Sequence, residues 1–143
     1  MTRFHDLKLS DVRRETADSV SLAFEIPDQD RDAFAFVPGQ YLTLRAEIEG
    51  FDVRRSYSIC SGVNDDELRV AIKRVDGGAF SAFANDDLKP GDKVGVMPPD
   101  GRFLAPLDPG QARTYVGFAA GSGITPLLAI LKSALEVEPL SRF

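Results

Sequence analysis

The chain has very few of the residues from which disulfides and metal sites are built. It contains one cysteine, Cys60, and one histidine, His5, among 143 residues. A single cysteine excludes a disulfide within the chain and an iron–sulfur cluster held by four of its own cysteines. A single histidine excludes a histidine-based triad and a multi-histidine metal site. No metal ligand is therefore predicted, and Cys60 is interpreted as a buried small side chain.

Long apolar runs and an excess of positive charge are also lacking. No apolar stretch approaches the roughly 20 residues that a membrane-spanning helix needs, so no membrane partner is expected. The first residues, 1–6, lack the apolar core of a secretory signal, which indicates a cytoplasmic protein. The net charge of −5 argues against a nucleic-acid partner, because domains that bind nucleic acid usually carry a basic face.

The first two thirds of the chain contain a series of short β-strand patterns. Residues 20–24 and 41–45 alternate apolar and polar side chains with a period of two, as half-buried strands do. One short helix is predicted before the last strand, because Phe80, Phe83 and Ala84 recur at one-turn spacing. The pattern predicts a mainly β, six-stranded barrel, since closure removes exposed strand edges. Four further segments of strand length are bounded by turn residues: 4–12, 53–60, 68–75 and 93–97.

The pattern changes after a loop at residues 106–110. Residues 114–119 form a nearly continuous apolar run, which is typical of a strand covered on both faces in a parallel sheet. A glycine turn comes next, and then a helical apolar pattern over about residues 123–137 that ends before a proline. This succession predicts the first βα unit of an α/β nucleotide-binding domain. The predicted domains are therefore a β-barrel at residues 1–107 and the start of a second domain at residues 112–143.

The run Arg55-Ser56-Tyr57-Ser58 lies in the predicted strand 53–60. Alternation places Arg55 and Tyr57 on one face of the strand and Ser58 on the other. A guanidinium group offers a fork of donors that suits a phosphate, and a phenol ring can stack on the flat ring system of a flavin. A nearby serine hydroxyl can donate to the flavin N5, the atom that accepts hydride. The alternative is an ordinary strand with a surface arginine and a core tyrosine.

A glycine turn, Gly77-Gly78-Ala79-Phe80-Ser81, comes after the predicted strand 68–75. Small residues at a helix start let backbone N–H groups approach a phosphate, and the helix dipole favours its negative charge. Ser81 can add a hydroxyl donor. Lys73 and Arg74, just upstream, suit a solvated edge better than direct ligands, though their strand backbone could contact the same cofactor, and Ile72 and Lys73 are included among the predicted cofactor-binding residues. The alternative is a plain strand-to-helix turn whose glycines serve only the backbone.

The second glycine turn, Gly121-Ser122-Gly123, lies where the later strand pattern gives way to a helix, which is the context that makes such a motif credible. It departs from the dinucleotide fingerprint G-x-G-x-x-G because position 126 is proline. Pro126 suits the first turn of a helix, where its missing N–H costs nothing. We interpret the turn as the seat of a nucleotide phosphate, with Thr125 close to the nicotinamide. A merely structural strand-to-helix turn is the alternative.

Taken together and in this order, the motifs resemble those of the ferredoxin–NADP reductase superfamily. The resemblance covers nearly the whole chain. Within the superfamily, residues 54–61 and 119–126 are most similar to the reductase component of phenylacetyl-CoA oxygenase and its relatives. The matching elements are R-x-Y-S at Arg55, Tyr57 and Ser58, the strand entry Pro38-Gly39-Gln40-Tyr41, G-x-x-S at Gly78 and Ser81, P-x-G-x-F at Pro99, Gly101 and Phe103, and G-x-G-x-T-P at Gly121, Gly123, Thr125 and Pro126.

The resemblance implies an FAD-binding Greek-key barrel, a nicotinamide-binding domain and a C-terminal [2Fe–2S] domain. In such an enzyme, hydride passes from NAD(P)H to FAD, and electrons then pass to the iron–sulfur centre and to an oxygenase or ferredoxin-like acceptor. It implies that Arg55 binds the pyrophosphate, that Tyr57 stacks on the flavin, and that Ser58, the catalytic candidate, hydrogen-bonds near N5. Gly78 and Ser81 would support the pyrophosphate. The segment from Gly121 through Gly123 to Thr125 would face the nicotinamide nucleotide.

The chain differs from that pattern after its last predicted helix. The rest of a nicotinamide domain and all cluster cysteines are missing, so these residues alone are expected to be inactive with NAD(P)H. The apolar segment 112–137 is then expected to pack back on the barrel, to associate with a second copy, or to be poorly ordered, with self-association favoured. A non-catalytic flavin-binding module that docks on an electron-transfer partner is the alternative to a reductase.

Overall fold

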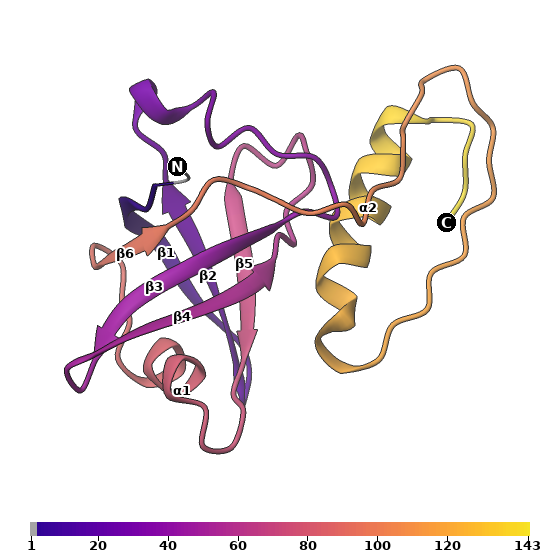
Figure 1. Cartoon of the computed structure of the whole chain (residues 1–143). Coiled ribbons are helices and arrows are strands. Elements are labelled where there is room, and N and C mark those ends of the chain that lie inside the picture. The colour runs from indigo at the N-terminus through magenta and orange to yellow at the C-terminus, as the bar shows by residue number, and fades with distance from the viewer. Residues whose placement is uncertain (1–2) are drawn as a thin grey trace.

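The computed structural model describes residues 3–143 (Figure 1). Met1 and Thr2, which belong to the N-terminal stretch and to the first predicted domain, lie outside the described residues. No helix among residues 3–143 has the length and apolar character needed to cross a membrane. The elements, in chain order, are β1 (His5–Thr16), β2 (Ser19–Glu25), η1 (Asp28–Asp30), β3 (Tyr41–Ile48), β4 (Phe51–Ser58), β5 (Leu68–Lys73), α1 (Ala79–Asp86), β6 (Lys93–Val96), η2 (Gly121–Gly123) and α2 (Ile124–Val137).

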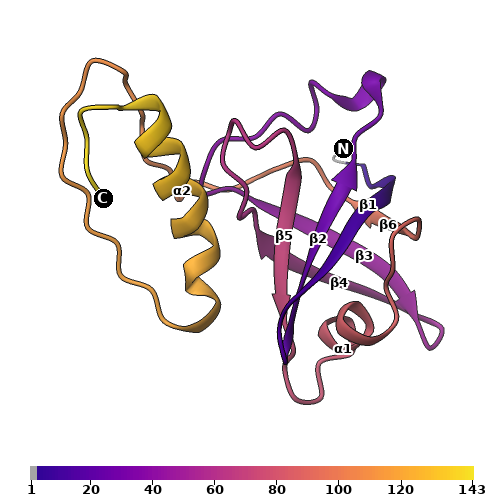
Figure 2. The same cartoon turned by 180° about the vertical axis from the view of Figure 1, so that it is seen from behind.

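The six predicted strands all form, and they make one antiparallel sheet in the order β4-β3-β6-β1-β2-β5. The strand patterns were readable because each strand turns one row of side chains into the core, for example Leu42 and Leu44 of β3 and Val70 and Ile72 of β5, all with 0% exposure. The sheet curls strongly, so that its two edge strands, β4 and β5, approach each other (Figure 2).

The sheet is not a closed barrel, so the predicted closure of the six strands is corrected, although the six strands themselves form. The edge strands β4 and β5 meet only at an isolated bridge between Ile59 and Val70 among the described residues. Farther along, α1 packs against β3, β4 and β5, and its Phe80 is buried in the space between the two edges. A helix in that position keeps the edges from forming a continuous hydrogen-bonded ladder. An open seam therefore runs between β4 and β5.

The predicted βα unit at the end of the chain is confirmed in its helix and not in its strand. The helix α2 begins at Ile124 and ends at Val137, close to the predicted bounds. Residues 114–119, predicted as a strand, form only an isolated parallel bridge between Thr114 and Arg142. A parallel strand needs neighbouring strands to accept and donate its backbone hydrogen bonds. Within residues 3–143, only the segment at Arg142 lies alongside.

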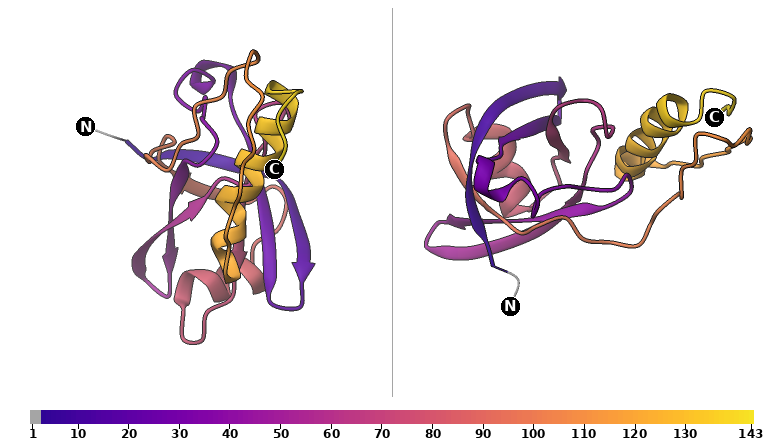
Figure 3. Two further views of the ribbon diagram at one scale, coloured as in Figure 1. Left: turned by 90° about the vertical axis from the view of Figure 1, so that its right-hand side faces the viewer. Right: turned by 90° about the horizontal axis from the view of Figure 1, so that it is seen from above.

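The helix α2 packs back on the loop between β4 and β5, beside the ends of these strands, which is the first of the three outcomes considered for segment 112–137 (Figure 3). Its inner face is buried, with Ala129 and Ala134 at 0% exposure. Its other face leaves Ile124 53% and Leu135 45% exposed. Self-association through that face stays a prediction.

Candidate functional site

The open seam contains a cleft of about 380 Å³ where β4 meets the turn between β5 and α1. The two motifs that the sequence placed more than twenty residues apart therefore share one site. Val75 and Asp76 belong to the cleft as well, although no sequence motif identified them. The full lining consists of Arg55, Ser56, Tyr57, Lys73, Val75, Asp76, Gly77, Gly78, Phe80 and Ser81.

Arg55 and Tyr57 point to the same side of β4, as predicted. They lie opposite Leu44 and Leu42 of β3 in the antiparallel register. The Arg55 side chain is exposed, and its Nη1 donates to the Arg54 carbonyl at 2.6 Å. The Tyr57 ring is half-buried with its centroid 5.8 Å from that of Phe80. Burial raises the pKa of the Tyr57 hydroxyl, against an opposing effect of the Arg55 charge, so Tyr57 is a neutral ring at physiological pH.

The turn from Val75 to Ser81 is held in shape by the Ser81 hydroxyl. Ser81 Oγ accepts the Val75 N–H at 3.0 Å and donates to the Gly78 carbonyl at 3.1 Å. A Cβ on Gly78 would lie 2.6 Å from Ser81 Oγ, so this position requires glycine. Gly77 has φ +70°, a left-handed conformation that glycine adopts without strain. In this arrangement the Ser81 proton is used inside the turn, and Ser81 acts on the cleft by shaping it.

The amino end of α1 presents backbone donors to the cleft. The N–H groups of Ala79 and Phe80 lie in the first helical turn, where no preceding helical carbonyl is available to accept them. No side chain caps this end, and the first turn carries no acidic residue, so the helix dipole is left to favour an anion. Two charged side chains also line this part of the cleft. The Lys73 ammonium group lies 3.6 Å from the Asp18 carboxylate. The Asp76 carboxylate would repel an anion.

Ile72 differs from the other predicted site residues because its side chain is fully buried in the core. Only its backbone could contact a ligand, and its carbonyl already accepts the Asn85 Nδ2 at 3.2 Å. Asn85 also donates to the Ser81 carbonyl at 2.9 Å and so ties α1 to β5. The sequence carries a signal for this role, because Asn85 is a polar residue one helical turn after Ser81 on the buried face of α1.

Ser58 does not line the cleft, because it lies on the opposite face of β4. It faces Tyr41 of β3 and is partly buried. Its neighbour on that face, Ser56, borders the cleft through its backbone position, and its Oγ lies 3.0 Å from Thr43 Oγ1. Within residues 3–143, no side-chain hydrogen bond involves Ser58, so its hydroxyl is available to a ligand at the end of β4.

The second glycine turn lies at the start of α2 and outside the cleft. Gly121, at φ +57°, and Gly123 belong to η2, and Gly123 precedes the first residue of α2. Thr125 Oγ1 donates to the Ser122 carbonyl at 2.9 Å. Thr125 also lines a separate cavity of about 300 Å³ between α2 and the sheet. The amino ends of α1 and α2 both lie toward the same end of the molecule (Figure 1).

With this geometry established, comparison with known proteins identifies the family. Residues 6–104 match the oxidoreductase FAD-binding domain family. The chain belongs to this family. As a member of the FAD-binding oxidoreductases, it shares its fold with the flavohem-like FAD/NAD binding domain of nitric oxide dioxygenase from Vibrio cholerae O1 biovar El Tor, at a TM-score of 0.73 and 27% identity over 90% of this chain and 56% of that one.

Two curated relatives of the chain are parts of oxygenase systems by name. It is 44% identical to a subunit of the 1,2-phenylacetyl-CoA epoxidase from Escherichia coli (strain K12), over 100% of this chain and 40% of that protein. It is 43% identical to the ferredoxin reductase component of 3-ketosteroid-9-alpha-monooxygenase from Rhodococcus rhodochrous, over 90% of this chain and 36% of that protein. The chain thus spans less than half the length of these relatives.

The donor set of the cleft fits an FAD molecule. A flavin needs an aromatic or apolar surface for its flat ring, and its pyrophosphate needs cationic and N–H donors. The cleft offers the neutral ring of Tyr57, the guanidinium of Arg55 and the first-turn N–H groups of α1. A further cleft of about 450 Å³ shares Gly77 and Gly78 with the first.

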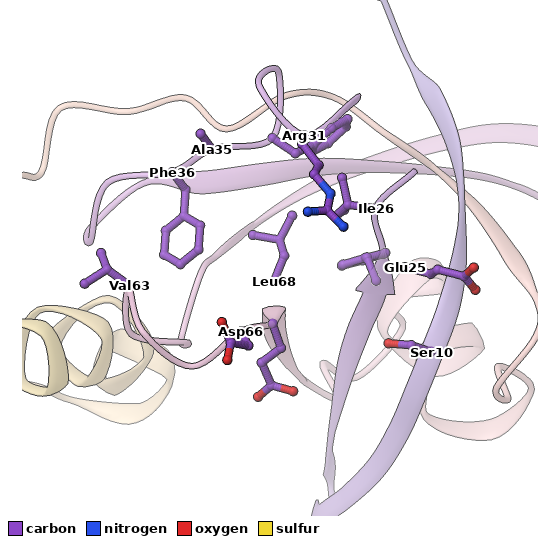
Figure 4. Close-up of a pocket in the computed structure, with 12 residues that line it drawn as sticks. Ser10, Glu25, Ile26, Arg31, Ala35, Phe36, Val63, Asp66 and Leu68 are labelled. Carbon is purple, nitrogen blue, oxygen red and sulfur yellow. The ribbon is translucent and has the colours of Figure 1, made fainter. Parts of the chain in front are cut away.

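A larger cleft of about 840 Å³ lies elsewhere and holds none of the predicted site residues (Figure 4). Its floor is apolar, with Phe36 and Leu68, and its one cation, Arg31, is paired with Asp28 at 2.9 Å. The cleft of Arg55 and Tyr57 suits a flavin better than this one, because it combines a cation, an aromatic ring, helix N–H groups and a glycine turn. Among residues 3–143, no group of His, Cys, Asp and Glu side chains is arranged to hold a metal ion.

Proposed function

We propose that this chain is the FAD-binding part of a reductase component. In the complete enzyme, hydride would pass from NAD(P)H to FAD, and electrons would then pass to an iron–sulfur centre and an oxygenase of the phenylacetyl-CoA type. The observation that carries the proposal is the shared cleft of Arg55, Tyr57 and the turn Gly77–Ser81. The relatives support the oxygenase partner, since both are named as parts of an epoxidase or a monooxygenase.

The proposal gives a part to four groups in and beside the cleft. The Arg55 guanidinium and the N–H groups of Ala79 and Phe80 would bind the pyrophosphate. The Tyr57 ring would cover one face of the flavin ring and exclude water from it. Ser58 would hydrogen-bond near N5 from the end of β4. When bound, the flavin supplies a hydride acceptor that can release electrons singly.

The proposal also covers the domain boundaries, the place of the iron–sulfur cluster and the cellular location. Residues 1–107 would be the FAD-binding domain, and residues 112–143, with Gly121, Gly123 and Thr125, would begin the NAD(P)-binding domain. A [2Fe–2S] cluster would lie on another segment or partner, because Cys60 is the only cysteine of this chain. A cytoplasmic location and a ferredoxin-like or oxygenase acceptor belong to the same proposal.

The test is the affinity of the purified protein for FAD and for FMN, with a matched pair of arginine variants. Arg55→Ala should weaken FAD binding about tenfold to a hundredfold, because a charge-assisted contact contributes about 1.5–3 kcal/mol. Arg54→Ala is the control. Arg54 is the preceding residue on the same strand, faces away from the cleft and pairs with Asp52 at 2.6 Å.

Wild-type protein should also bind FAD more tightly than FMN, because the helix turn and Arg55 together suit a pyrophosphate. Equal FAD affinity in Arg55→Ala and Arg54→Ala would overturn the assignment of the cleft. Firm FAD binding by a chain whose flavin fails to pass electrons to any acceptor, even when joined to a complete nucleotide domain, would favour the non-catalytic module instead.

A further inference from the structure

The loop between β4 and β5, residues 59–67, fastens α2 to the sheet. The sequence suggests a solvated acidic turn here, at Asp65-Asp66-Glu67, yet Asp65 has only 16% of its side chain exposed. Asp65 accepts the Gly62 N–H at 2.8 Å and forms an ion pair with Lys132 of α2. Two further hydrogen bonds cross the same junction, from Val63 N–H to Ser133 Oγ at 3.1 Å and from Asn64 Nδ2 to Glu136 Oε2 at 2.9 Å.

Small residues let the loop and the helix approach closely. A Cβ on Gly62 would lie 3.1 Å from the Lys132 Cβ, which is tighter than ordinary packing. On the helix side, Ala129, Ser133 and Ala134 have 0% exposure. Ser133 Oγ donates to the Ala129 carbonyl at 2.7 Å, which orients its lone pairs toward the loop. The junction is therefore a packed and hydrogen-bonded contact rather than a loose one.

The position of this junction sets the position of the second glycine turn. Lys132 lies two helical turns after Thr125, about 10 Å along the helix axis at 1.5 Å per residue. The turn at Gly121–Gly123 leads directly into the same helix. The amino-terminal part of α2 also forms one wall of the 300 Å³ cavity, through Thr125 and Leu128, while Cys60 lies at the start of the β4–β5 loop and lines the same cavity. A rigid helix transmits a shift at Lys132 to all of these groups.

We propose that the β4–β5 loop is a clasp for α2, and that Asp65 is a positioning residue which fixes the nucleotide turn relative to the sheet. The inference rests on the proposed function for the roles of the cleft and the turn. Asp65 lines neither the cleft nor the turn, and it acts through Lys132. Loss of its charge should let α2 move away from the sheet while the flavin cleft, built from β4 and the β5–α1 turn, keeps its shape.

Cys60 offers a direct measurement of that movement. It is 8% exposed, it lines the cavity that α2 closes, and it is the only cysteine, so a thiol reagent gives one product detectable by mass. Burial raises the pKa of the Cys60 thiol to about 11, so the thiol reacts slowly at neutral pH and should react faster when the cavity opens. Asp65→Asn should speed labelling by N-ethylmaleimide about tenfold, since hydrogen bonds to charged groups contribute about 1.5 kcal/mol or more.

Three further variants distinguish loss of the Asp65–Lys132 ion pair from a general destabilisation of the protein. Lys132→Met should speed labelling as Asp65→Asn does, whereas Lys132→Arg keeps the cation and should retain the wild-type rate. Asp66→Asn is the matched control, because Asp66 is the next residue, is exposed and has φ +52°, which asparagine adopts readily. In the double variant Asp65→Asn/Lys132→Met the two effects should not add.

The proposal is overturned if Asp65→Asn labels at the wild-type rate, if Asp66→Asn labels as fast as Asp65→Asn, or if Lys132→Arg labels as fast as Lys132→Met. A labelling rate that rises steeply with low urea would also overturn it, because that dependence marks global unfolding rather than release of α2. FAD affinity should be the same in Asp65→Asn and wild type. Failure of the proposed function would appear separately, as unchanged FAD binding in Arg55→Ala.

Discussion

The Ser81 hydroxyl occupies the space that a side chain on Gly78 would need. A Cβ on Gly78 would come within 2.6 Å of Ser81 Oγ and 3.0 Å of the Val75 carbonyl oxygen. The two named members of the G-x-x-S turn are therefore linked through shape: glycine makes room for the hydroxyl, and the hydroxyl closes the turn by bonding to Val75 and Gly78. This relationship places the amino end of α1 against β4, where it borders the cleft proposed for FAD.

Gly78→Ala should break this relationship. The added methyl group must displace Ser81, and overpacking of this kind costs about 1–3 kcal/mol of folding free energy. We expect a lower melting temperature and weaker FAD binding, measured by thermal unfolding and by flavin titration. Gly123→Ala is the control, because Gly123 has φ −60° and open space around its Cα. Equal melting temperatures in the two variants would contradict the steric account of the turn.

Tyr57 should contribute to FAD binding through its ring and not through its hydroxyl. Its phenol is neutral because burial raises its pKa, and Phe80 lies against its ring. Tyr57→Phe should therefore bind FAD almost as the wild type does. Tyr57→Leu should bind about twofold to tenfold more weakly, because aromatic pairs contribute about 0.5–1.5 kcal/mol beyond their buried area. Fluorescence titration with FAD measures both, and a Tyr57→Phe variant as weak as Tyr57→Leu would assign the contact to the hydroxyl.

Ser58 should affect hydride transfer more than flavin affinity. Its hydroxyl has no side-chain hydrogen bond within residues 3–143, so Ser58→Ala should leave folding and FAD binding nearly unchanged. Flavin reduction by NADH, measured by stopped flow in a reductase that joins this segment to a complete nucleotide domain, should slow about tenfold through loss of one hydrogen bond to the reacting flavin. Ser56→Ala, two residues earlier on the same face and bonded to Thr43, is the control. Reduction at the wild-type rate in Ser58→Ala would remove it from the catalytic role.

Glu138 should make the attachment of residues 108–115 sensitive to acid. Its carboxylate is fully buried. Burial alone would raise its pKa, but hydrogen bonds from Ser141, the Asp108 N–H and Tyr115, together with the Arg113 charge, outweigh that effect and lower it. Because the folded-state pKa lies below the ordinary value of 4.5, this stabilisation is fully present above pH 4.5 and is lost as the pH falls through the folded-state pKa.

The measurement for Glu138 is the NMR signal of the Tyr115 ring between about pH 6 and about pH 3, a range that spans the ordinary carboxyl pKa values. Wild type should keep Tyr115 in place at the upper end of that range, where its hydroxyl donates to Glu138 Oε2 at 2.9 Å, and release it in acid. Glu138→Gln should lack this transition and show a partly released ring already at the upper end. Glu47→Gln, an exposed carboxylate on β3, should behave as wild type. A Tyr115 signal that does not change with pH in the wild type would refute the carboxylate as the anchor.

The parts of the fold that were predicted correctly depend on neighbours in sequence. Alternation along β3 and the turn residues around it predict a strand whichever strands it later pairs with. Gly78 together with Phe80 predicts the start of α1. The helix α2 was predicted for the same reason, from apolar residues at helical spacing. The run 114–119 was apolar enough for a strand, yet a strand also needs a partner, and apolar character says nothing about whether one lies alongside.

The amino-acid sequence by itself determined the strands, the two helices, the family and the residue types that suit a flavin, because alternation, helical spacing and glycine turns are local properties of the chain. Only the tertiary structure decided that the sheet stays open between β4 and β5, that Arg55 and Gly78 share one cleft, and that Asp65 faces Lys132, 67 residues away, rather than solvent. These outcomes depend on which groups meet after folding. The partners of a long-range hydrogen bond or ion pair cannot be read from the sequence, because they come together only when the chain packs.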